Sequence, residues 1–460
     1  MKGWAFALGF LWPTDGRRID VVNRCSRPMI IAPTGGNAQV PCGNCPGMTC
    51  NPINNQCYFD FEMPGNDWTI DPGEQISLYT PNEAVRQGNG VVADWSGKLE
   101  FYANHTRDGG LIASAFCNNK PFCPSYQGLN GVATAVEFTL VPFGPDFYDV
   151  SVINGFNVAI EMKPSTRFDR VSEEAAGSHK GYNCGAAGAF HQKDTRLSSC
   201  SWAFNTSTDV QRDLGPLLRQ VDGNGVPCTS NSDCLETNTR CGQKAVRVRN
   251  ALTGQDQPTT EIRMECGHQI GWWSIYQLCV WSGNNYVSPA PFDGLIDCPA
   301  HHQMFACAGA APWTTTCYSQ HTGSCCGCAN WQQLLNTSVP KAHEGCQGSD
   351  PLWQKYAMPF LEILKRACPT AYTYAFDDES STFTCQSSSS RDGFEANVAE
   401  YTITLCPNQM ATVSHQNSDE LLRLAPLGPL HVNATAISKA SFQYHVYWMF
   451  LLFLSLPMRS

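Results

Sequence analysis

Twenty-four cysteines among 460 residues constrain the fold of this chain more than any other feature. A reduced cytosolic protein would hold so many thiols mainly for metals, and a zinc site needs paired knuckles at matching distances. Cys42 and Cys45 form one such pair, and Cys325, Cys326 and Cys328 form another local cluster, but no matching pair follows at the spacing of a zinc finger. We therefore expect disulfides, no metal site, and an oxidising compartment.

The charge balance excludes one large class of partner. The formal net charge is −10, only 15% of the residues are charged, and Lys and Arg form no cluster. Binding to a phosphate backbone requires a basic face, so we expect no nucleic-acid partner. Hydrophobic residues make up 42% of the chain and aromatic residues 11%, which is enough for a sizeable core in two or three domains.

The clearest local pattern is an alternation of side chains over residues 147–153, with Asp149 on the mixed face and an apolar face opposite. This period of two predicts a strand. Asn154 and Gly155 follow, a dipeptide that tight turns prefer because both central residues need positive φ. We therefore predict a hairpin whose second strand covers residues 156–160.

Several other short runs in the first 163 residues predict strands. The clearest are residues 68–70, 75–79 and 135–141, which alternate or are β-branched and are separated by turn residues. Many short strands joined by Gly and Pro turns are typical of a sandwich or a barrel.

One stretch has a strong helical pattern. Asp350 can cap the first free amides of a helix and Pro351 suits its first turn. Apolar side chains between residues 352 and 364 form one stripe, and Cys368-Pro369 ends it. Pro359 lies inside that stripe, so we predict a kink or two short helices.

Four motifs, in order along the chain, resemble the thaumatin-like protein family. They cover residues 19–25, 67–73, 149–157 and 368–385. The third resembles the Asp-x-Ser-x-Val-Asp-Gly-Phe-Asn hallmark, and the fourth resembles the Cys-Pro-x-Ala-Tyr-Ser-Tyr, Asp-Asp and Ser-Thr-Phe-Thr-Cys run. The resemblance implies a mainly β fold, namely a flattened antiparallel β-sandwich with a disulfide-rich, loop-dominated second domain that carries the helix.

These motifs suggest a division of the chain. We expect, in order, a signal segment (1–18), a sandwich (19–170, completed by 369–407), a disulfide-rich domain (171–368) with an insertion foreign to the family (about 206–318), a stalk (408–440) and a hydrophobic tail (441–460). The apolar run in the tail, residues 446–457, is short for a bilayer span. We interpret it as a signal for a GPI anchor, with a short membrane anchor as the alternative.

The resemblance also implies that Cys25 pairs with Cys406 and that Cys117 and Cys123 close a small loop. Further cysteines expected in disulfides are Cys184, Cys325, Cys326, Cys346, Cys368 and Cys385. The even number in the insertion suggests bridges among its own cysteines. Four glycosylation sequons agree with secretion, at Asn104, Asn205, Asn336 and Asn433.

The functional feature of the family is an acidic cleft thought to bind β-glucan. Carried over residue by residue, its positions fall on Glu137, Asp149, Asn154, Asp377 with the adjacent Asp378, and Tyr102. Asn154 replaces a carboxylate and Tyr102 stands nearest to an arginine, so two of the charges are lost. Carboxylates accept hydrogen bonds from sugar hydroxyls, and Tyr102, Phe147 or Tyr148 offers a ring to a pyranose face.

We therefore expect a secreted or surface-anchored monomer without cofactor that binds β-1,3-glucan-type polysaccharide in defence or at the cell wall. One alternative is a weak endo-β-1,3-glucanase with Glu137 as acid and Asp149 or Asp377 as base or nucleophile. A second is a cysteine-rich protein-interaction module with a vestigial cleft.

Several of these residues and motifs can have a purely structural role instead of a functional one. Asp149 can be a solvated strand residue and Asp377-Asp378 a turn. Trp272 and Trp273 fit a small core better than a sugar platform. His268, His301 and His302 fit a surface better than a metal site.

Overall fold

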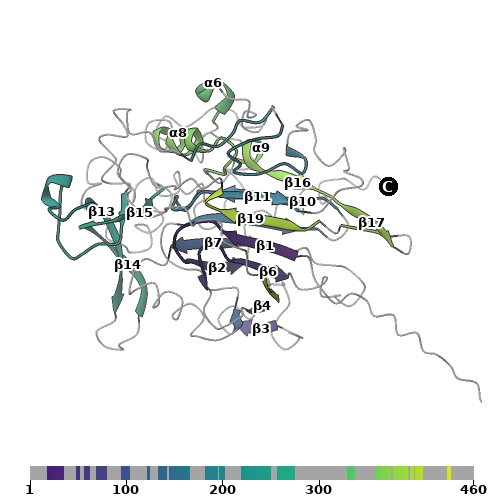
Figure 1. The fold of residues 1–460 in the computed structure, drawn as a ribbon, viewed down its shortest axis with the longest axis horizontal. Helices are drawn as coiled ribbons and strands as arrows, with labels where there is room; N and C mark the ends of the chain where they lie inside the picture. The colour runs from purple at the N-terminus through teal and green to yellow at the C-terminus, as the bar shows by residue number, and fades with distance from the viewer. Residues whose placement is uncertain are drawn as a thin grey trace, which may run out of the picture.

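The computed structural model describes the chain in segments (Figure 1). They are residues 18–35, 48–51, 56–62, 69–79, 95–103, 122–124, 133–141, 144–165, 182–194, 196–202, 219–249, 256–274, 329–336, 358–374, 377–391, 394–397, 399–407 and 432–436.

One sheet of the structure has five strands and brings together segments from both ends of the chain. Its central strand, β1, runs parallel to the neighbouring strand β19, with Val21 opposite Ile403. β20 lies parallel to β6 at one edge, within the segment expected to be a stalk. In spatial order the strands are β11 (Ile160–Pro164), β19 (Tyr401–Leu405), β1 (Arg18–Asn23), β6 (Gln75–Tyr79) and β20 (Val432–Ala436).

A second sheet has six strands, all antiparallel to their neighbours. In spatial order they are β16 (Phe383–Cys385), β10 (Asp146–Ser151), β9 (Thr134–Leu140), β7 (Trp95–Ala103), β2 (Met29–Gly35) and β5 (Thr69–Ile70). Aromatic side chains pack between the two sheets. The ring of Tyr401 (β19) lies 5.6 Å from that of Phe138 (β9) and 5.2 Å from that of Tyr148 (β10), measured between centroids. The predicted β-sandwich is confirmed.

The predicted hairpin after residue 153 is wrong. β10 pairs with β9 and β16, whereas β11 pairs with β19 in the other sheet, so the chain crosses between the sheets. The turn itself forms, with Gly155 at φ +96° donating its N–H to Val152 O at 2.9 Å. Asn157 then holds the crossover against the six-stranded sheet that it leaves, since its side chain donates to Phe101 O (2.7 Å) and accepts from Thr134 N (2.9 Å).

The main helix, α8 (Met358–Ala367), differs from the predicted kinked rod. It begins at Met358, so Pro359 lies in its first turn, where a missing N–H is harmless. The stretch expected to precede it lies outside the described residues. Two short helices, α6 (Trp331–Leu335) and α9 (Asp378–Ser381), lie on the same side of the sandwich as α8 (Figure 1).

Part of the segment that we expected to be loop-dominated forms a sheet. Its strands, in spatial order, are β14 (Asp256–Gly267), β13 (Arg240–Arg249), β12 (Arg219–Val221) and β15 (Gln269–Trp272), with the short 3-10 helix η4 (Asn231–Asp233) before β13. We call it the β12–β15 sheet, and Figure 1 shows it beside the sandwich. Two small sheets contain β3 (Met48–Asn51), β4 (Gln56–Glu62) and β8 (Phe122–Pro124), and β17 (Ser388–Arg391) and β18 (Phe394–Asn397).

Disulfides join distant parts of the chain. The described bridges are Cys25–Cys406, Cys184–Cys385, Cys200–Cys368, Cys228–Cys241 and Cys234–Cys266. The first is the pair that the resemblance implies, and the last two lie wholly within the β12–β15 segment. Cys200 was not among the expected cysteines. The expected residues whose side chains lie outside the description are Cys117, Cys123, Cys325, Cys326 and Cys346.

The remaining expectations concern the surface and the termini. Asn336 is exposed at the C-terminal end of α6, and the side chains of the other three sequon asparagines lie outside the description. Across the described segments, no helix is both long enough and apolar enough to span a membrane. Residues 1–17 of the expected signal segment and the hydrophobic tail lie outside these segments, whereas Arg18 begins β1.

Candidate functional site: an acidic face on three strands

The predicted carboxylates Glu137 and Asp149 lie side by side. They are directly opposite each other on the antiparallel strands β9 and β10. Asp149 is 7% exposed, and its Oδ1 atom accepts no hydrogen bond from any residue in the described segments. A buried acceptor without a donor is rare in native proteins, which singles out this carboxyl group as a candidate for binding or chemistry.

The surroundings of Asp149 favour its protonated form. Burial is the largest cause that raises its pKa well above the ordinary value, and the nearby charge of Glu137 adds to it. Asp378 and Asp377 raise the pKa further, and the ammonium group of Lys365 opposes them. Asp149 therefore keeps its proton to a higher pH than an ordinary carboxyl group, and a protonated carboxyl can donate a hydrogen bond.

Asp377 does not take the ligand-binding role expected of it. It is 2% exposed, and donors from its own chain occupy both carboxylate oxygens. Oδ2 accepts from Lys365 Nζ at 2.7 Å and Thr373 N at 3.0 Å. Oδ1 accepts from Trp331 Nε1 at 2.7 Å and from the Ser380 hydroxyl. This carboxylate is therefore part of the internal structure.

Lys365 is the cation of that internal network. Its side chain is fully buried and also donates to Ala371 O at 2.8 Å, to Ser380 Oγ at 2.6 Å and to Ser381 Oγ at 2.8 Å. Burial lowers its pKa to about 8, while Asp377 opposes that change. Lys365 lies four residues after the buried Leu361, so helical spacing places it beside the apolar stripe of α8.

Asp378 is the accessible member of the late aspartate pair. It is half-buried, and its Oδ1 accepts from the Tyr372 hydroxyl at 2.7 Å. Its charge contributes to raising the pKa of Asp149, so the two carboxyl groups interact.

Tyr102 and Asn154, the two positions at which expected charges are lost, both hydrogen-bond to Glu100. This carboxylate was not among the predicted site residues. Tyr102 is 7% exposed and donates to Glu100 Oε2 at 3.0 Å, while Asn154 Nδ2 donates to Glu100 Oε1 at 3.3 Å. Lys98 Nζ lies 2.6 Å from the same Oε1 atom. The alternation of β7 places these three β7 residues on one face, a signal that was available in the sequence.

Lys98 also restores a cation to the site. It lies directly opposite Glu137 on the neighbouring strand, and Glu137 lies opposite Asp149. The row Lys98, Glu137, Asp149 thus crosses three strands, β7, β9 and β10. We call this row, together with Glu100 and Asp378, the acidic face.

The aromatic candidates on β10, Phe147 and Tyr148, differ in their exposure. Phe147 is 37% exposed on the Asp149 side of β10 and can offer a ring to a ligand. Tyr148 is 1% exposed, and its hydroxyl donates to Gly185 O at 2.6 Å, so it belongs to the core.

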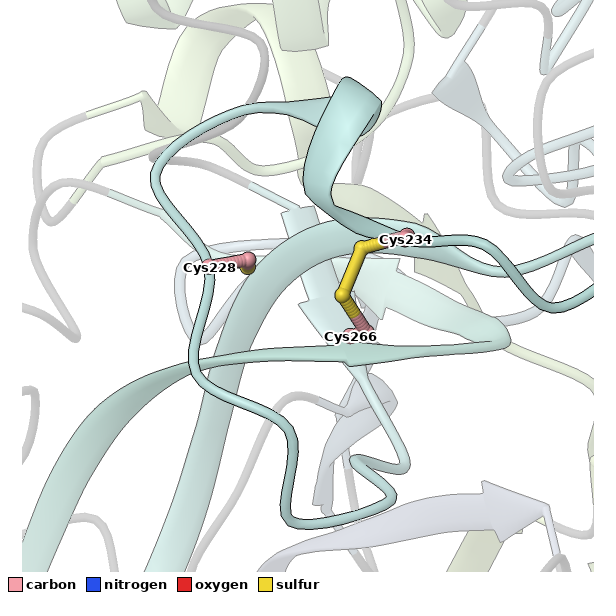
Figure 2. Close-up of side chains that lie close together, drawn as sticks. All are labelled: Cys228, Cys234 and Cys266. Atoms are coloured by element: carbon pink, nitrogen blue, oxygen red, sulfur yellow. A yellow bond between two sulfur atoms is a disulfide. The ribbon is translucent and has the colours of Figure 1, made fainter.

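Three cysteines of the β12–β15 segment come as close together as metal ligands. The sulfur atoms of Cys228, Cys234 and Cys266 all lie within 4.8 Å of one another (Figure 2). However, Cys234 and Cys266 form a disulfide, drawn as the yellow bond, and Cys228 is bonded to Cys241. Metal binding needs free thiolates, so in its oxidised form this cluster consists of two disulfide crosslinks and does not offer metal ligands.

The tryptophans and the histidine near β15 lie in ordinary structural surroundings. Trp272 and Trp273 are 6% and 1% exposed, which makes them core residues and not an open platform. His268 Nδ1 lies 3.5 Å from Asp222 Oδ2, and His301 and His302 lie outside the described residues.

Comparison with known proteins agrees with the fold and the motifs. The model of the thaumatin family matches residues 60–272. The match therefore reaches into the range that we had treated as foreign to the family. A thaumatin-like protein 1 from Pyrus pyrifolia is 27% identical over 179 residues, which are 36% of this chain and 62% of the relative.

Other matches are shorter and closer. The pathogenesis-related thaumatin-like protein 3.5 of Cryptomeria japonica is 47% identical over 49 residues, or 11% of this chain and 16% of the relative. A PR5-like receptor kinase of Arabidopsis thaliana is 36% identical over 111 residues, or 21% of this chain and 17% of the relative. The chain spans about a sixth of the length of the first relatives. The matched range, a little less than half of the chain, and the sandwich together show that this part of the chain is similar to the thaumatin family.

Proposed function

We propose that this protein is a secreted or surface-anchored thaumatin-like protein that binds β-1,3-glucan-type polysaccharide on its acidic face. The observation that carries the proposal is the buried Asp149 carboxyl group, whose Oδ1 atom accepts no hydrogen bond from a described residue and which lies opposite Glu137. Relatives named as pathogenesis-related support a role in defence.

The acidic face suits a polyhydroxylated ligand. Protonated Asp149 donates a hydrogen bond, while ionised carboxylates accept from sugar hydroxyls. Lys98 reduces the repulsion between carboxylates and adds a donor, since its ammonium group lies 2.6 Å from Glu100. Phe147, exposed on the same side of β10, provides an apolar surface for the C–H face of a sugar ring.

The disulfides support secretion. Five bridges in the described residues close loops of up to 381 residues, and such bridges persist in oxidising compartments. We also propose that residues 441–460 direct attachment of a GPI anchor. Treatment of cells with a GPI-cleaving phospholipase tests this proposal, and we expect the treatment to release the protein.

Co-sedimentation of the full secreted chain with insoluble β-1,3-glucan tests the binding proposal. We expect the wild type to sediment and Glu137→Gln and Asp149→Asn to lose most of that binding. Asp71→Asn is the matched control, because Asp71 is an exposed turn residue outside the acidic face. Failure of the wild type to sediment, or equal sedimentation of all four proteins, contradicts the proposal.

A weak endo-β-1,3-glucanase is the second candidate, favoured by the raised pKa of Asp149 beside a second carboxyl group. The roles then differ from our expectation, because Asp149 holds the proton and acts as the acid while Glu137 acts as base or nucleophile. Asp377 takes no part, since both its oxygens are occupied. Release of new reducing ends from soluble β-1,3-glucan, abolished in Asp149→Asn, is the expected sign of this activity.

A further inference from the structure

The β12–β15 sheet is attached to the crossover that follows β10. Phe156 and Trp272 form an isolated antiparallel bridge, with Phe156 N donating to Trp272 O at 2.8 Å and Trp272 N to Phe156 O at 2.6 Å. The hydroxyl of Ser274 donates to Ile153 O. Two successive parts of the crossover therefore hydrogen-bond to the end of β15 and the residues after it.

The attachment is buried and closely fitted. Phe156 is 0% exposed, and its ring stacks on Trp202 with centroids 5.2 Å apart. Gly271 lies against the crossover backbone, because a Cβ atom there would be only 2.8 Å from Phe156 O. A side chain at position 271 would therefore push the strand away from the crossover.

The crossover carries a residue of the site. Asn154 lies in its turn and donates to Glu100, which also contacts Lys98. From the other side, Val152 N donates to Tyr372 O at 2.9 Å. The residues that directly follow β10, the strand that carries Asp149, therefore hydrogen-bond to Tyr372 on one side. On the other side they hydrogen-bond to the β12–β15 sheet and to Ser274 after it.

We propose that Gly271, Trp272 and Ser274 are positioning residues for the acidic face: they fix the turn at residues 152–155, so ligand affinity depends on a sheet that does not touch the ligand. This inference rests on the proposed function. It differs from the interpretation of this segment as an independent protein-interaction module, because here the sheet acts on the site of the sandwich itself.

Ser274→Ala in the full chain tests the inference with two readouts. We expect amide hydrogen exchange at Gly155 and Phe156 to accelerate and affinity for β-1,3-glucan to fall, each by about 2- to 10-fold for one lost hydrogen bond. Ser274→Thr keeps a hydroxyl group and is expected to restore both. Ser232→Ala is the control, since Ser232 is exposed in the same segment and, among the described residues, its side chain hydrogen-bonds to Ser230 Oγ.

The two readouts separate the possible failures. Unchanged exchange in Ser274→Ala overturns the inference whether or not the protein binds glucan. Faster exchange with unchanged affinity also overturns it, because the turn then loosens without affecting the site. If the wild type binds no glucan, the proposed function fails, and the exchange data still decide whether the sheet holds the turn. Gly271→Val is the stronger variant and should exceed the effect of Ser274→Ala in both readouts.

Discussion

Two buried aspartates of this protein, Asp149 and Asp377, have opposite surroundings. Asp377 accepts hydrogen bonds at both oxygens and lies 2.7 Å from the ammonium group of Lys365. Asp149 is almost as buried, yet its Oδ1 accepts from no described residue and its neighbours Glu137 and Asp378 are acidic. The resemblance to one family marks both positions, but of the two only Asp149 combines a raised pKa with an oxygen that accepts from no described residue.

The comparison teaches that two carboxyl groups with similar burial can differ in hydrogen bonding and in pKa. A buried charge that is paired and fully hydrogen-bonded contributes to the structure, and removing its partner is costly. A buried carboxyl group with a raised pKa and an oxygen that accepts no hydrogen bond destabilises the fold, and such groups cluster at functional sites.

The largest expected effect comes from removing the cation of the internal network. Lys365→Met leaves Asp377 buried without a counter-charge, so we expect the free energy of unfolding to fall by about 3–5 kcal/mol. Denaturant unfolding measures it. Lys163→Met is the control, because Lys163 is exposed and its ion pair with Glu161 contributes at most about 1 kcal/mol. Equal stability of the two variants contradicts the account.

The comparison itself is tested by making the same substitution at both aspartates. Asp377→Asn leaves the buried Lys365 without its counter-charge, so it should cost nearly as much as Lys365→Met. Asp149→Asn removes a group that is costly to bury in its charged form, so its stability should equal or exceed that of the wild type. Similar losses for both variants in denaturant unfolding would show that the two environments do not differ as described.

The raised pKa of Asp149 predicts the sign of a pH dependence. The unfolded chain loses this proton near pH 4, whereas the folded protein keeps it to higher pH. The folded state therefore binds more protons between these values, and this contribution to stability falls as the pH rises from about 4 to the raised pKa. Asp149→Asn should lose that decline in unfolding curves collected across pH, and an unchanged slope would count against the raised pKa.

The smallest expected effect concerns Asp378. Tyr372→Phe removes the 2.7 Å hydrogen bond to its Oδ1 atom and should cost about 0.5–1.5 kcal/mol. Thermal unfolding detects a change of that size. A loss as large as that of Lys365→Met would place Asp378 in the structural network with Asp377.

Much of the fold could be predicted from local patterns. The run at residues 75–79 is β6 as expected, and the resemblance implied the Cys25–Cys406 bridge. The crossover was missed because Asn154-Gly155 indicates a turn without indicating the partner of the next strand. That choice depends on contacts distant in sequence, such as the hydrogen bond from Asn157 to Phe101 O.

The site was predicted in part. Glu137 and Asp149 were expected together, and strand register places them opposite each other. Glu100 and Lys98 were missed because each cleft position was sought singly, and neighbouring residues of β7 on the same face were not considered. The internal role of Asp377 was missed because the direction of the Lys365 side chain follows from tertiary packing.

The most direct test measures the carboxyl titrations of Asp149 and Asp377 by NMR, with and without a soluble β-1,3-glucan oligosaccharide. The account predicts that Asp149 titrates above the ordinary range, that the oligosaccharide changes its titration, and that Asp377 is unaffected. An ordinary pKa for Asp149 that the oligosaccharide leaves unchanged would contradict the assignment of the acidic face as the binding site.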